Sequence, residues 1–260
     1  MKQVCLRLFT LVFAAAVLAG CSTVPVTGRS QFNFISQEKE MQLGLTSFNQ
    51  MKKDVPVSKD VAANALLQKV GKQIAAVAAP DMPNAQWEFV VFESKEANAF
   101  CLPGGKVGVY TGILPITKNE AGLATVIGHE VAHAVARHGG ERMSEATALQ
   151  AGGQIAGALT SSASPITQQA VGLVYGLGSQ LGYALPHSRK QESEADRMGL
   201  TYMARAGYNP EAAVSFWERF AAQSGSSGGP WFLRTHPVDK DRIADLKKWL
   251  PEATQQYHGK

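Results

Sequence analysis

The 260-residue sequence contains only three cysteines, which are too few for a fold held together by disulfides. Its 25 lysines and arginines, against 21 aspartates and glutamates, form no basic run or stripe, so we expect no nucleic acid as a partner. No apolar run reaches the roughly 20 residues of a membrane-spanning helix. With 45% hydrophobic and 18% charged residues, the chain is expected to be globular, neither disordered nor collagen-like.

Residues 1–20 are typical of a secretory signal peptide and are set aside from the fold prediction. Lys2 and Arg7 precede an uncharged run over residues 8–18, which is shorter than a bilayer span. The sequence Leu-Ala-Gly-Cys at 18–21 resembles the bacterial lipobox, which predicts cleavage before Cys21 and lipidation of its thiol. The alternative is an ordinary signal peptide that happens to end in cysteine. Ser22 after the cysteine favours sorting to the outer membrane.

The rest of the chain is predicted to form one mostly helical α+β domain. Residues 21–35 are expected to be a polar linker, residues 36–250 the domain and residues 251–260 a tail. Helices are expected at about 36–51, 59–79, 117–138, 188–206, 210–223 and 238–250, and strands at 87–92, 97–102 and 107–110 in a small antiparallel sheet. Thr117 and Glu120 fit a capping box that opens the third helix.

The stretch from residue 146 to 187 contains no Asp, Glu, Lys or Arg. Several of its glycines recur at four-residue spacing, which favours close helix packing. A membrane hairpin is the alternative, but the glutamines and a Ser/Thr cluster at 160–164 make this stretch too polar for membrane spans. Residues 224–229 are expected to form a flexible loop. Cys101 is expected to be a lone thiol, packed on a strand rather than acting as a nucleophile.

The sequence His129-Glu130-Val131-Ala132-His133 lies in the predicted helix 117–138 and places two histidines one turn apart on one face. Both imidazoles can reach one zinc ion, and Glu130 beside them can take a proton from the attacking water. On a helical wheel the two histidines lie off the apolar stripe, so core packing does not account for them. A catalytic zinc usually takes three protein ligands, so a third ligand must come from elsewhere.

Glu192 is the best candidate for the third ligand, because it shares a helix face with Asp196 one turn later. One carboxylate can bind the metal, and the other can orient a ligating histidine. The alternative is an exposed acidic turn facing Arg189 and Arg197. Glu194 points to another side of this helix and is expected to be solvated.

Four motifs together resemble the HtpX-like zinc metalloproteases, a gluzincin family that includes the CAAX prenyl endopeptidases and soluble periplasmic proteases. They are Gly-His-Glu-Val-Ala-His at 128–133, Ser-Arg-x-x-Glu-x-x-Ala-Asp-x-x-Gly at 188–199, Asn-Ala-Phe at 98–100 with Pro-Gly-Gly at 103–105, and Thr-His-Pro at 235–237 with Arg242. The resemblance covers about residues 36–250. It implies a zincin-like metalloprotease domain with an active-site helix. The integral-membrane members carry long apolar spans, which this chain lacks after its signal.

The resemblance implies one Zn²⁺ per chain, held by His129, His133 and Glu192. Glu130 is then the catalytic base, and Asp196 lies behind the ligands. Arg242 is included among the expected catalytic residues.

The expected substrates are unfolded or misfolded proteins. Asn98, Ala99 and Phe100 lie on the predicted strand 97–102, which can bind an extended substrate through backbone hydrogen bonds if it is an edge strand beside the metal. The alternative is an ordinary inner strand.

His236 directly precedes the last predicted helix and can reach the metal from a flexible segment. There it either stabilises the transition state or occupies the open position of the metal. A third possibility is that it caps or packs the final helix.

The expected protein is therefore a zinc endopeptidase anchored to the periplasmic face of the outer membrane through lipidated Cys21, degrading misfolded or damaged envelope proteins. The alternative is a lipoprotein that binds or chaperones outer-membrane components and holds a structural zinc. A structural site needs ligands but no base, so Glu130 argues against this alternative.

Overall fold

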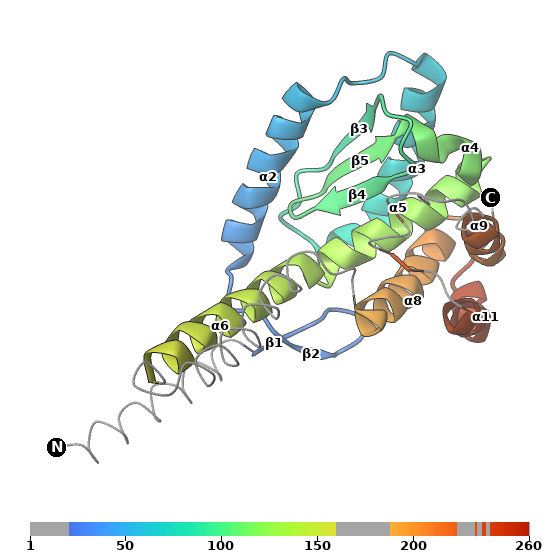
Figure 1. Cartoon of the computed structure of the whole chain (residues 1–260). Helices are drawn as coiled ribbons and strands as arrows, with labels where there is room; N and C mark the ends of the chain where they lie inside the picture. The colour runs from blue at the N-terminus through green and yellow to red at the C-terminus, as the bar shows by residue number, and fades with distance from the viewer. Residues whose placement is uncertain (1–20, 160–187, 223–231, 233–235, 238–239, 260) are drawn as a thin grey trace. The chain divides into compact units, whose positions relative to one another are not determined.

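The computed structural model describes residues 21–159, 188–222, 232, 236–237 and 240–259. The chain divides into two compact units, drawn from blue to red along the chain in Figure 1. The larger unit draws on residues 25–27, 37–138 and 186–260, and the smaller on residues 1–24, 28–36 and 139–185. The predicted signal peptide, most of the glycine-rich stretch 146–187 and the loop predicted at 224–229 lie outside the described residues.

The larger unit contains a three-stranded sheet in the order β3-β5-β4. β3 (Glu88–Phe92) runs parallel to β5 (Lys106–Tyr110), and β4 (Ala99–Leu102) runs antiparallel to β5. The three predicted strands are present, but the sheet is mixed, and the prediction of an all-antiparallel sheet is wrong. The tight turn at Gly104 and Gly105, both at positive φ, joins β4 directly to β5. Residues 93–98 instead carry the chain from β3 past the position of β5 to the far edge of the sheet.

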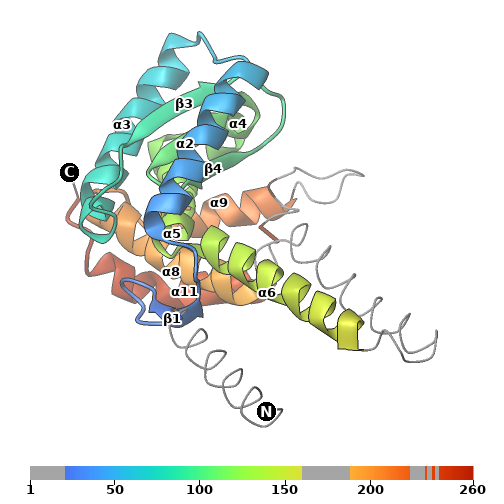
Figure 2. The ribbon, with the colours of Figure 1, turned by 90° about the vertical axis from the view of Figure 1, so that its left-hand side faces the viewer.

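One face of this sheet is aromatic and lies against α2 (Gln37–Asp54). Phe48 of α2 packs edge-to-face against Phe92 and Phe100, with ring centroids 6.0 and 6.2 Å apart. Tyr110 joins the same cluster through Phe92, 5.9 Å away. Because residues alternate between the two faces of a strand, these aromatic residues all point to one side. Figure 2 shows α2 in front of this face.

The opposite face is mostly aliphatic, with Phe89 as an aromatic member, and is covered by α3 (Val61–Ala78) and α5 (Glu120–Val135). Its buried side chains are Phe89, Val91, Val107 and Val109. Residues 122–135 of α5 are all buried, because the sheet, α3 and the C-terminal helices surround this helix. The two histidines were predicted to lie on a different face of this helix from its apolar stripe. Because the helix is buried on all sides, both faces lie inside the protein.

α5 begins two residues later than the predicted capping box implies. The side chain of Asn119 accepts a hydrogen bond from the Gly122 backbone N–H, whereas Thr117 ends the short helix α4 (Leu114–Thr117) and donates its hydroxyl proton to Leu114 O. Lys118, at a φ of 64°, separates the two helices. The predicted Thr117–Glu120 box is wrong, since Asn119 is the residue whose side chain caps the first turn, through the N–H of Gly122.

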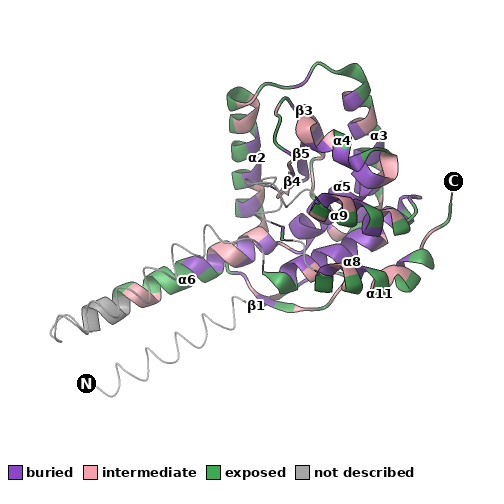
Figure 3. Cartoon of the chain, turned by 45° about the vertical axis from the view of Figure 1, so that its right-hand side comes forward, coloured by how far each residue is buried: buried purple, intermediate pink, exposed green. Residues whose placement is uncertain are grey.

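Three further helices pack on the side of α5 away from the sheet: α8 (Arg189–Arg205), α9 (Glu211–Ala222) and α11 (Lys240–Thr254). Ser188 and Gln191 form a capping box that starts α8. Gly207, at a φ of 83°, follows the end of this helix, as expected from the sequence. Exposed residues lie on the outer sides of α2 and α11 (Figure 3). Two 3₁₀ turns, η1 (Ala79–Asp81) and η2 (Thr111–Ile113), complete the described elements of the larger unit.

The smaller unit contains β1 (Cys21–Thr23), β2 (Ser30–Phe32) and nearly all of α6 (His138–Leu159). β1 and β2 pair antiparallel, so the segment predicted as a polar linker contains two short strands. Arg29 forms a two-point ion pair with Glu141 of α6 at 2.6 and 2.9 Å, which ties this segment to the helix. Gly139 and Gly140 lie within the first turn of α6. In the part of the chain that the structure describes, no helix is long and apolar enough to cross a membrane.

Candidate metal centre

The two histidines of α5 lie close enough to share one metal ion. His129 and His133 are 1% and 5% exposed, and their Nε2 atoms lie 3.1 Å apart. The helical spacing of four residues produces this arrangement, because it places the two rings one turn apart on the same face of the helix. Their rings meet edge-to-face with centroids 4.6 Å apart.

Glu192 reaches both histidines from the first turn of α8. Its Oε1 lies 3.2 Å from His133 Nε2, and its Oε2 lies 3.4 Å from His129 Nε2. The helices can approach this closely because α5 and α8 cross at Gly128 and Gly199. A Cβ added at Gly128 would lie 3.0 Å from Gly199 O.

His236 completes a cluster of four ligating side chains. Its Nδ1 lies 2.9 Å from Glu192 Oε1 and 3.2 Å from His129 Nε2, and its ring stacks on Phe232 at 4.3 Å. One ligand atom from each of His129, His133, Glu192 and His236 lies within 4.8 Å of the other three. The structure therefore places His236 at the predicted metal site, which is compatible with either predicted role there.

The donor set fits zinc. Imidazole nitrogens and a carboxylate oxygen are common zinc ligands, and tetrahedral zinc accepts four of them. All four side chains are buried, so a bound ion would be shielded from bulk water. Oε1 of the buried Glu130 has no hydrogen-bond partner among the described residues, which leaves a carboxylate oxygen free beside the cluster. His236 Nε2 lies 3.5 Å from this oxygen.

Asp196 and Arg242 lie behind the ligands. His129 Nδ1 lies 2.9 Å from Asp196 Oδ1, so the other ring nitrogen, Nε2, faces the cluster. Arg242 donates to both oxygens of Asp196, from Nε at 2.6 Å and Nη2 at 2.8 Å, and its Nη1 lies 2.7 Å from Glu192 Oε2. The guanidinium also stacks on Trp217, 3.8 Å from the ring centroid. These contacts make Arg242 a residue that holds the two carboxylates, and its expected place among the catalytic residues stays a prediction.

The charges in this cluster shift the pKa values of its members in different directions. Burial raises the pKa of Glu130 despite the nearby His236 and His129, which makes its carboxylate a better proton acceptor. Burial would also raise the pKa of Glu192, but His236, Arg242 and His129 hold it well below its ordinary value. Glu192 therefore stays ionised, as a metal ligand must be.

The pKa of His129 moves the other way. Burial would lower it, but Glu192 and Asp196 raise the pKa of His129 to about 9. Because a ligating imidazole must be neutral, metal binding at this site is coupled to release of a proton from His129.

Two buried residues near the cluster were missed or misplaced by the sequence interpretation. Glu194, predicted to be solvated, is only 8% exposed, and its Oε2 lies 3.0 Å from Nε2 of His138. His138 Nδ1 in turn lies 2.7 Å from Nδ1 of His133. No helical periodicity points to His138, because it lies beyond the end of α5.

The predicted substrate strand lies at an edge of the sheet. β4 has β5 on one side and, among the described residues, no strand on the other. Asn98 and Ala99 lie where β4 begins, next to Phe100, which packs over Gly108. Cys101 faces α5, and burial, together with the nearby Glu130, raises the pKa of its thiol, which favours the protonated form.

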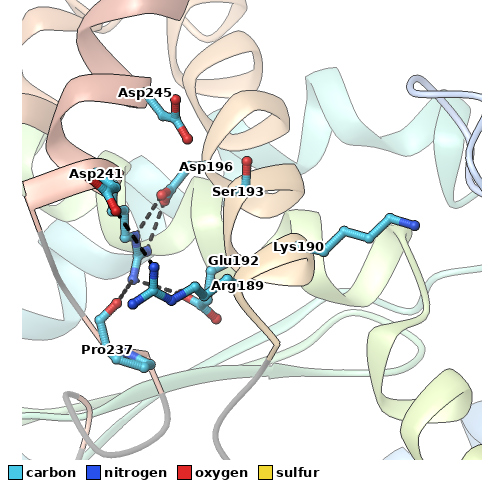
Figure 4. A pocket seen from close by; sticks show the side chains of 9 residues that line it. Arg189, Lys190, Glu192, Ser193, Asp196, Pro237, Asp241 and Asp245 are labelled. Carbon is cyan, nitrogen blue, oxygen red and sulfur yellow. Dashed lines mark hydrogen bonds and ion pairs between the residues drawn. The ribbon is translucent and has the colours of Figure 1, made fainter.

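A pocket of about 450 Å³ lies between α8 and α11. Glu192 and Asp196 form part of its wall on α8, and Asp241 and Asp245 line it from α11 (Figure 4). Arg189 and Lys190 lie at the start of α8 on the same rim. Both positively and negatively charged side chains thus line the pocket through which Glu192 and Asp196 can be reached.

Comparison with known proteins agrees with this geometry. The model of "Peptidase family M48" matches residues 62–250. The chain is 34% identical to the mitochondrial metalloendopeptidase OMA1 of Schizosaccharomyces pombe, over 94% of this chain and 73% of that protein. It is 28% identical to the beta-barrel assembly-enhancing protease of Escherichia coli, over 90% of this chain and 48% of that protein. The chain therefore belongs to peptidase family M48 and is a zinc metalloendopeptidase.

Proposed function

We propose that this chain is a lipid-anchored endopeptidase that works at the periplasmic face of the bacterial outer membrane and degrades misfolded or damaged envelope proteins. The Leu-Ala-Gly-Cys sequence at 18–21 supports the anchor at Cys21. A relative named as a beta-barrel assembly-enhancing protease supports an envelope role. Other relatives are named as mitochondrial, and the lipobox-like sequence of this chain is the reason that we favour the bacterial envelope.

The observation that carries the peptidase proposal is the outer edge of β4, near Glu130, which pairs with no further strand among the described residues. Asn98 O accepts a hydrogen bond from Tyr110 N of β5. Because hydrogen-bonded and outward-facing residues alternate in an antiparallel pair, the backbone C=O groups of Ala99 and Cys101 point away from β5. An extended peptide can add to this edge as a further strand, through main-chain hydrogen bonds that select little for side chains. Such binding suits unfolded segments and excludes folded domains.

The chain's own residues supply the remaining steps of hydrolysis. Zinc held by His129, His133 and Glu192 would supply a Lewis acid to polarise the scissile carbonyl and to activate water. Glu130 Oε1, buried and raised in pKa, accepts the proton of the attacking water and then delivers it to the leaving nitrogen. Asp196 keeps Nε2 of His129 directed at the metal site, while Arg242 keeps Asp196 and Glu192 in place.

The second candidate, a binding module or chaperone with a structural zinc, is disfavoured by Glu130. A structural site gains nothing from a buried carboxylate with an unsatisfied oxygen, which costs free energy without adding a ligand. A base in this position is useful only if water is to be deprotonated.

Cleavage of an unfolded substrate tests the proposal. The purified full-length chain in detergent, loaded with zinc, is incubated with casein, with an unfolded outer-membrane protein and with the same protein folded. We expect the two unfolded substrates to be cut and the folded one to be spared, and we expect Glu130→Gln to cut none. Glu252→Gln, an exposed carboxylate on α11, is the matched control. Failure of both the wild type and His236→Ala to cut either unfolded substrate would refute the proposal.

A further inference from the structure

The second histidine ligand is held from behind by a buried histidine and a buried carboxylate. His133 Nδ1 lies 2.7 Å from His138 Nδ1, and His138 Nε2 lies 3.0 Å from Glu194 Oε2. His138 is 0% exposed, so water does not compete for either of its ring nitrogens. We propose that His138 and Glu194 are positioning residues that hold His133 in the orientation and the tautomer that bind zinc.

The atom of His133 that faces the metal site determines which atom donates and which accepts in each hydrogen bond from His133 through His138 to Glu194. His133 Nε2 faces the cluster, 3.1 Å from His129 Nε2, and must present a lone pair to bind a metal. Its Nδ1 then carries the proton and donates to Nδ1 of His138. The proton of His138 is consequently on Nε2, which donates to the carboxylate of Glu194. With both rings neutral, this is the one arrangement that satisfies all three side chains.

The backbone adopts an unfavourable conformation at Arg137, the residue directly before His138. Arg137 has a φ of 56°, a left-handed conformation that costs a non-glycine residue about 1 kcal/mol or more. The buried Glu40 accepts a hydrogen bond from Arg137 Nε at 2.9 Å and holds this turn. In a continuous helix a residue at i+5 points about 140° away from residue i. The bend at Arg137 is what allows His138 to face back towards His133.

Glu194 is itself fixed on both oxygens. The hydroxyl of Thr27 donates to Oε1, while His138 occupies Oε2. Two residues further along α8, Asp196 contacts Nδ1 of His129 at 2.9 Å. One helix therefore orients both histidine ligands, His129 directly and His133 through His138. Ligating histidines commonly donate their second ring N–H to such a partner, and loss of the partner typically weakens metal binding.

Zinc affinity, measured by competition with a chromophoric chelator on the purified full-length chain, tests this proposal. We expect His138→Leu to lower zinc affinity roughly 10–100-fold. We expect His138→Asn to recover part of this loss, because the asparagine Oδ1 can take the place of the Nδ1 acceptor. Combining His138→Leu with Glu194→Leu should weaken zinc binding no further than His138→Leu alone, since Glu194 acts on the metal only through His138. His258→Leu, an exposed histidine near the C-terminus, is the matched control and should change nothing.

A spectroscopic measurement separates positioning from general stabilisation. The N–H proton of His133 Nδ1 should give a strongly downfield NMR signal in the zinc-bound chain that is lost in His138→Leu and kept in His138→Asn. A merely structural histidine would lower the melting temperature of the metal-free chain and leave zinc affinity unchanged. Wild-type zinc affinity in folded His138→Leu overturns the proposal. If that variant does not fold, wild-type affinity in Glu194→Met, which keeps the length of the side chain but removes the acceptor of the His138 Nε2–H, overturns it.

The inference rests on the zinc site and not on the substrate. Zinc binding without cleavage of unfolded proteins would refute the proposed function and leave the role of His138 standing. Cleavage with zinc affinity independent of His138 would do the reverse.

Discussion

Gly128 of α5 and Gly199 of α8 meet backbone to backbone where the two helices cross. A Cβ on Gly199 would lie 3.0 Å from the backbone nitrogen of His129, so a side chain at either position fits only if the two helices move apart by a few tenths of an ångström. The crossing brings Oε2 of Glu192, on α8, to 3.4 Å from Nε2 of His129, on α5. The distance between the histidines and the third ligand is thus set by the absence of two side chains.

Gly199→Ala should therefore separate α5 from α8 and weaken both the fold and the metal site. Overpacking of this kind costs roughly 1–3 kcal/mol of unfolding free energy. Thermal unfolding of the metal-free chain and zinc affinity by chelator competition measure the two effects. Gly139→Ala is the matched control, since a Cβ there meets nothing within 4 Å. Equal melting temperatures for the two variants would show that the crossing relaxes without loss.

Glu130→Gln should retain zinc and fold while losing turnover. The amide keeps the shape of the side chain but cannot accept a proton, and general base catalysis typically contributes about 10²–10⁴-fold. Zinc content by atomic absorption and cleavage of an unfolded substrate check the two halves. Loss of stoichiometric zinc in this variant would mean that Glu130 holds the site together, and its assignment as the base would be wrong.

The metal ligands were predictable because helical spacing is a local property. His129 and His133 are one turn apart whatever surrounds them, and the same holds for Glu192 and Asp196 on α8. The family resemblance then joined the two helices and placed them in one domain. The predicted helices and strands are all present, with ends shifted by a few residues.

The errors concern properties that depend on distant parts of the chain. Glu194 was expected to be exposed to solvent, because the sequence of its own helix does not reveal its contact with His138. That contact depends on the bend of the backbone at Arg137. The alternation within β3 does not reveal that β5 lies beside it in parallel, because strand order depends on the path of the connecting segments. Thr117 and Asn119 both suit a helix start, and the turn at Lys118 decides in favour of Asn119.

Arg242→Met should destabilise the fold strongly. Arg242 is 7% exposed and contacts both Asp196 and Glu192, so its loss removes the permanent positive charge that, together with His129, compensates these two buried carboxylates. Breaking a buried ion pair on one side costs about 3–5 kcal/mol. Arg197→Met is the matched control, because its pair with Glu252 is half exposed and worth at most about 1 kcal/mol. Denaturant unfolding of the metal-free variants should show this difference, and a similar small cost for both would contradict the role assigned to Arg242.

Cys21→Ser should release the chain from membranes into the soluble periplasmic fraction. The prediction follows from the proposed lipid anchor, since multiple acyl chains hold a protein on a bilayer and their loss removes that hold. Fractionation of cells followed by immunoblotting measures it, with Cys101→Ser as the control that leaves the lipobox intact. Membrane association that survives a carbonate wash in Cys21→Ser would point to the glycine-rich stretch 146–187 as a membrane element.

His236→Ala distinguishes a blocking histidine from a catalytic one. With its Nδ1 2.9 Å from Glu192 Oε1, His236 lies in the ligand cluster itself, and zinc with four protein ligands has no open position for water. We therefore expect His236→Ala to raise specific peptidase activity at saturating zinc, while the loss of a ligand lowers zinc affinity.

The opposite results have different meanings, and one set of measurements separates them. Activity and melting temperature are compared for His236→Ala and for the exposed-histidine control His258→Ala, with zinc occupancy measured in each. Reduced activity at full zinc occupancy would show that His236 stabilises the transition state, for which a neutral imidazole is suited. A lower melting temperature with unchanged activity per folded molecule would instead reflect the loss of its stacking on Phe232, 4.3 Å away. A free position on the metal is required for hydrolysis, so only increased activity is consistent with His236 as a ligand of the resting enzyme.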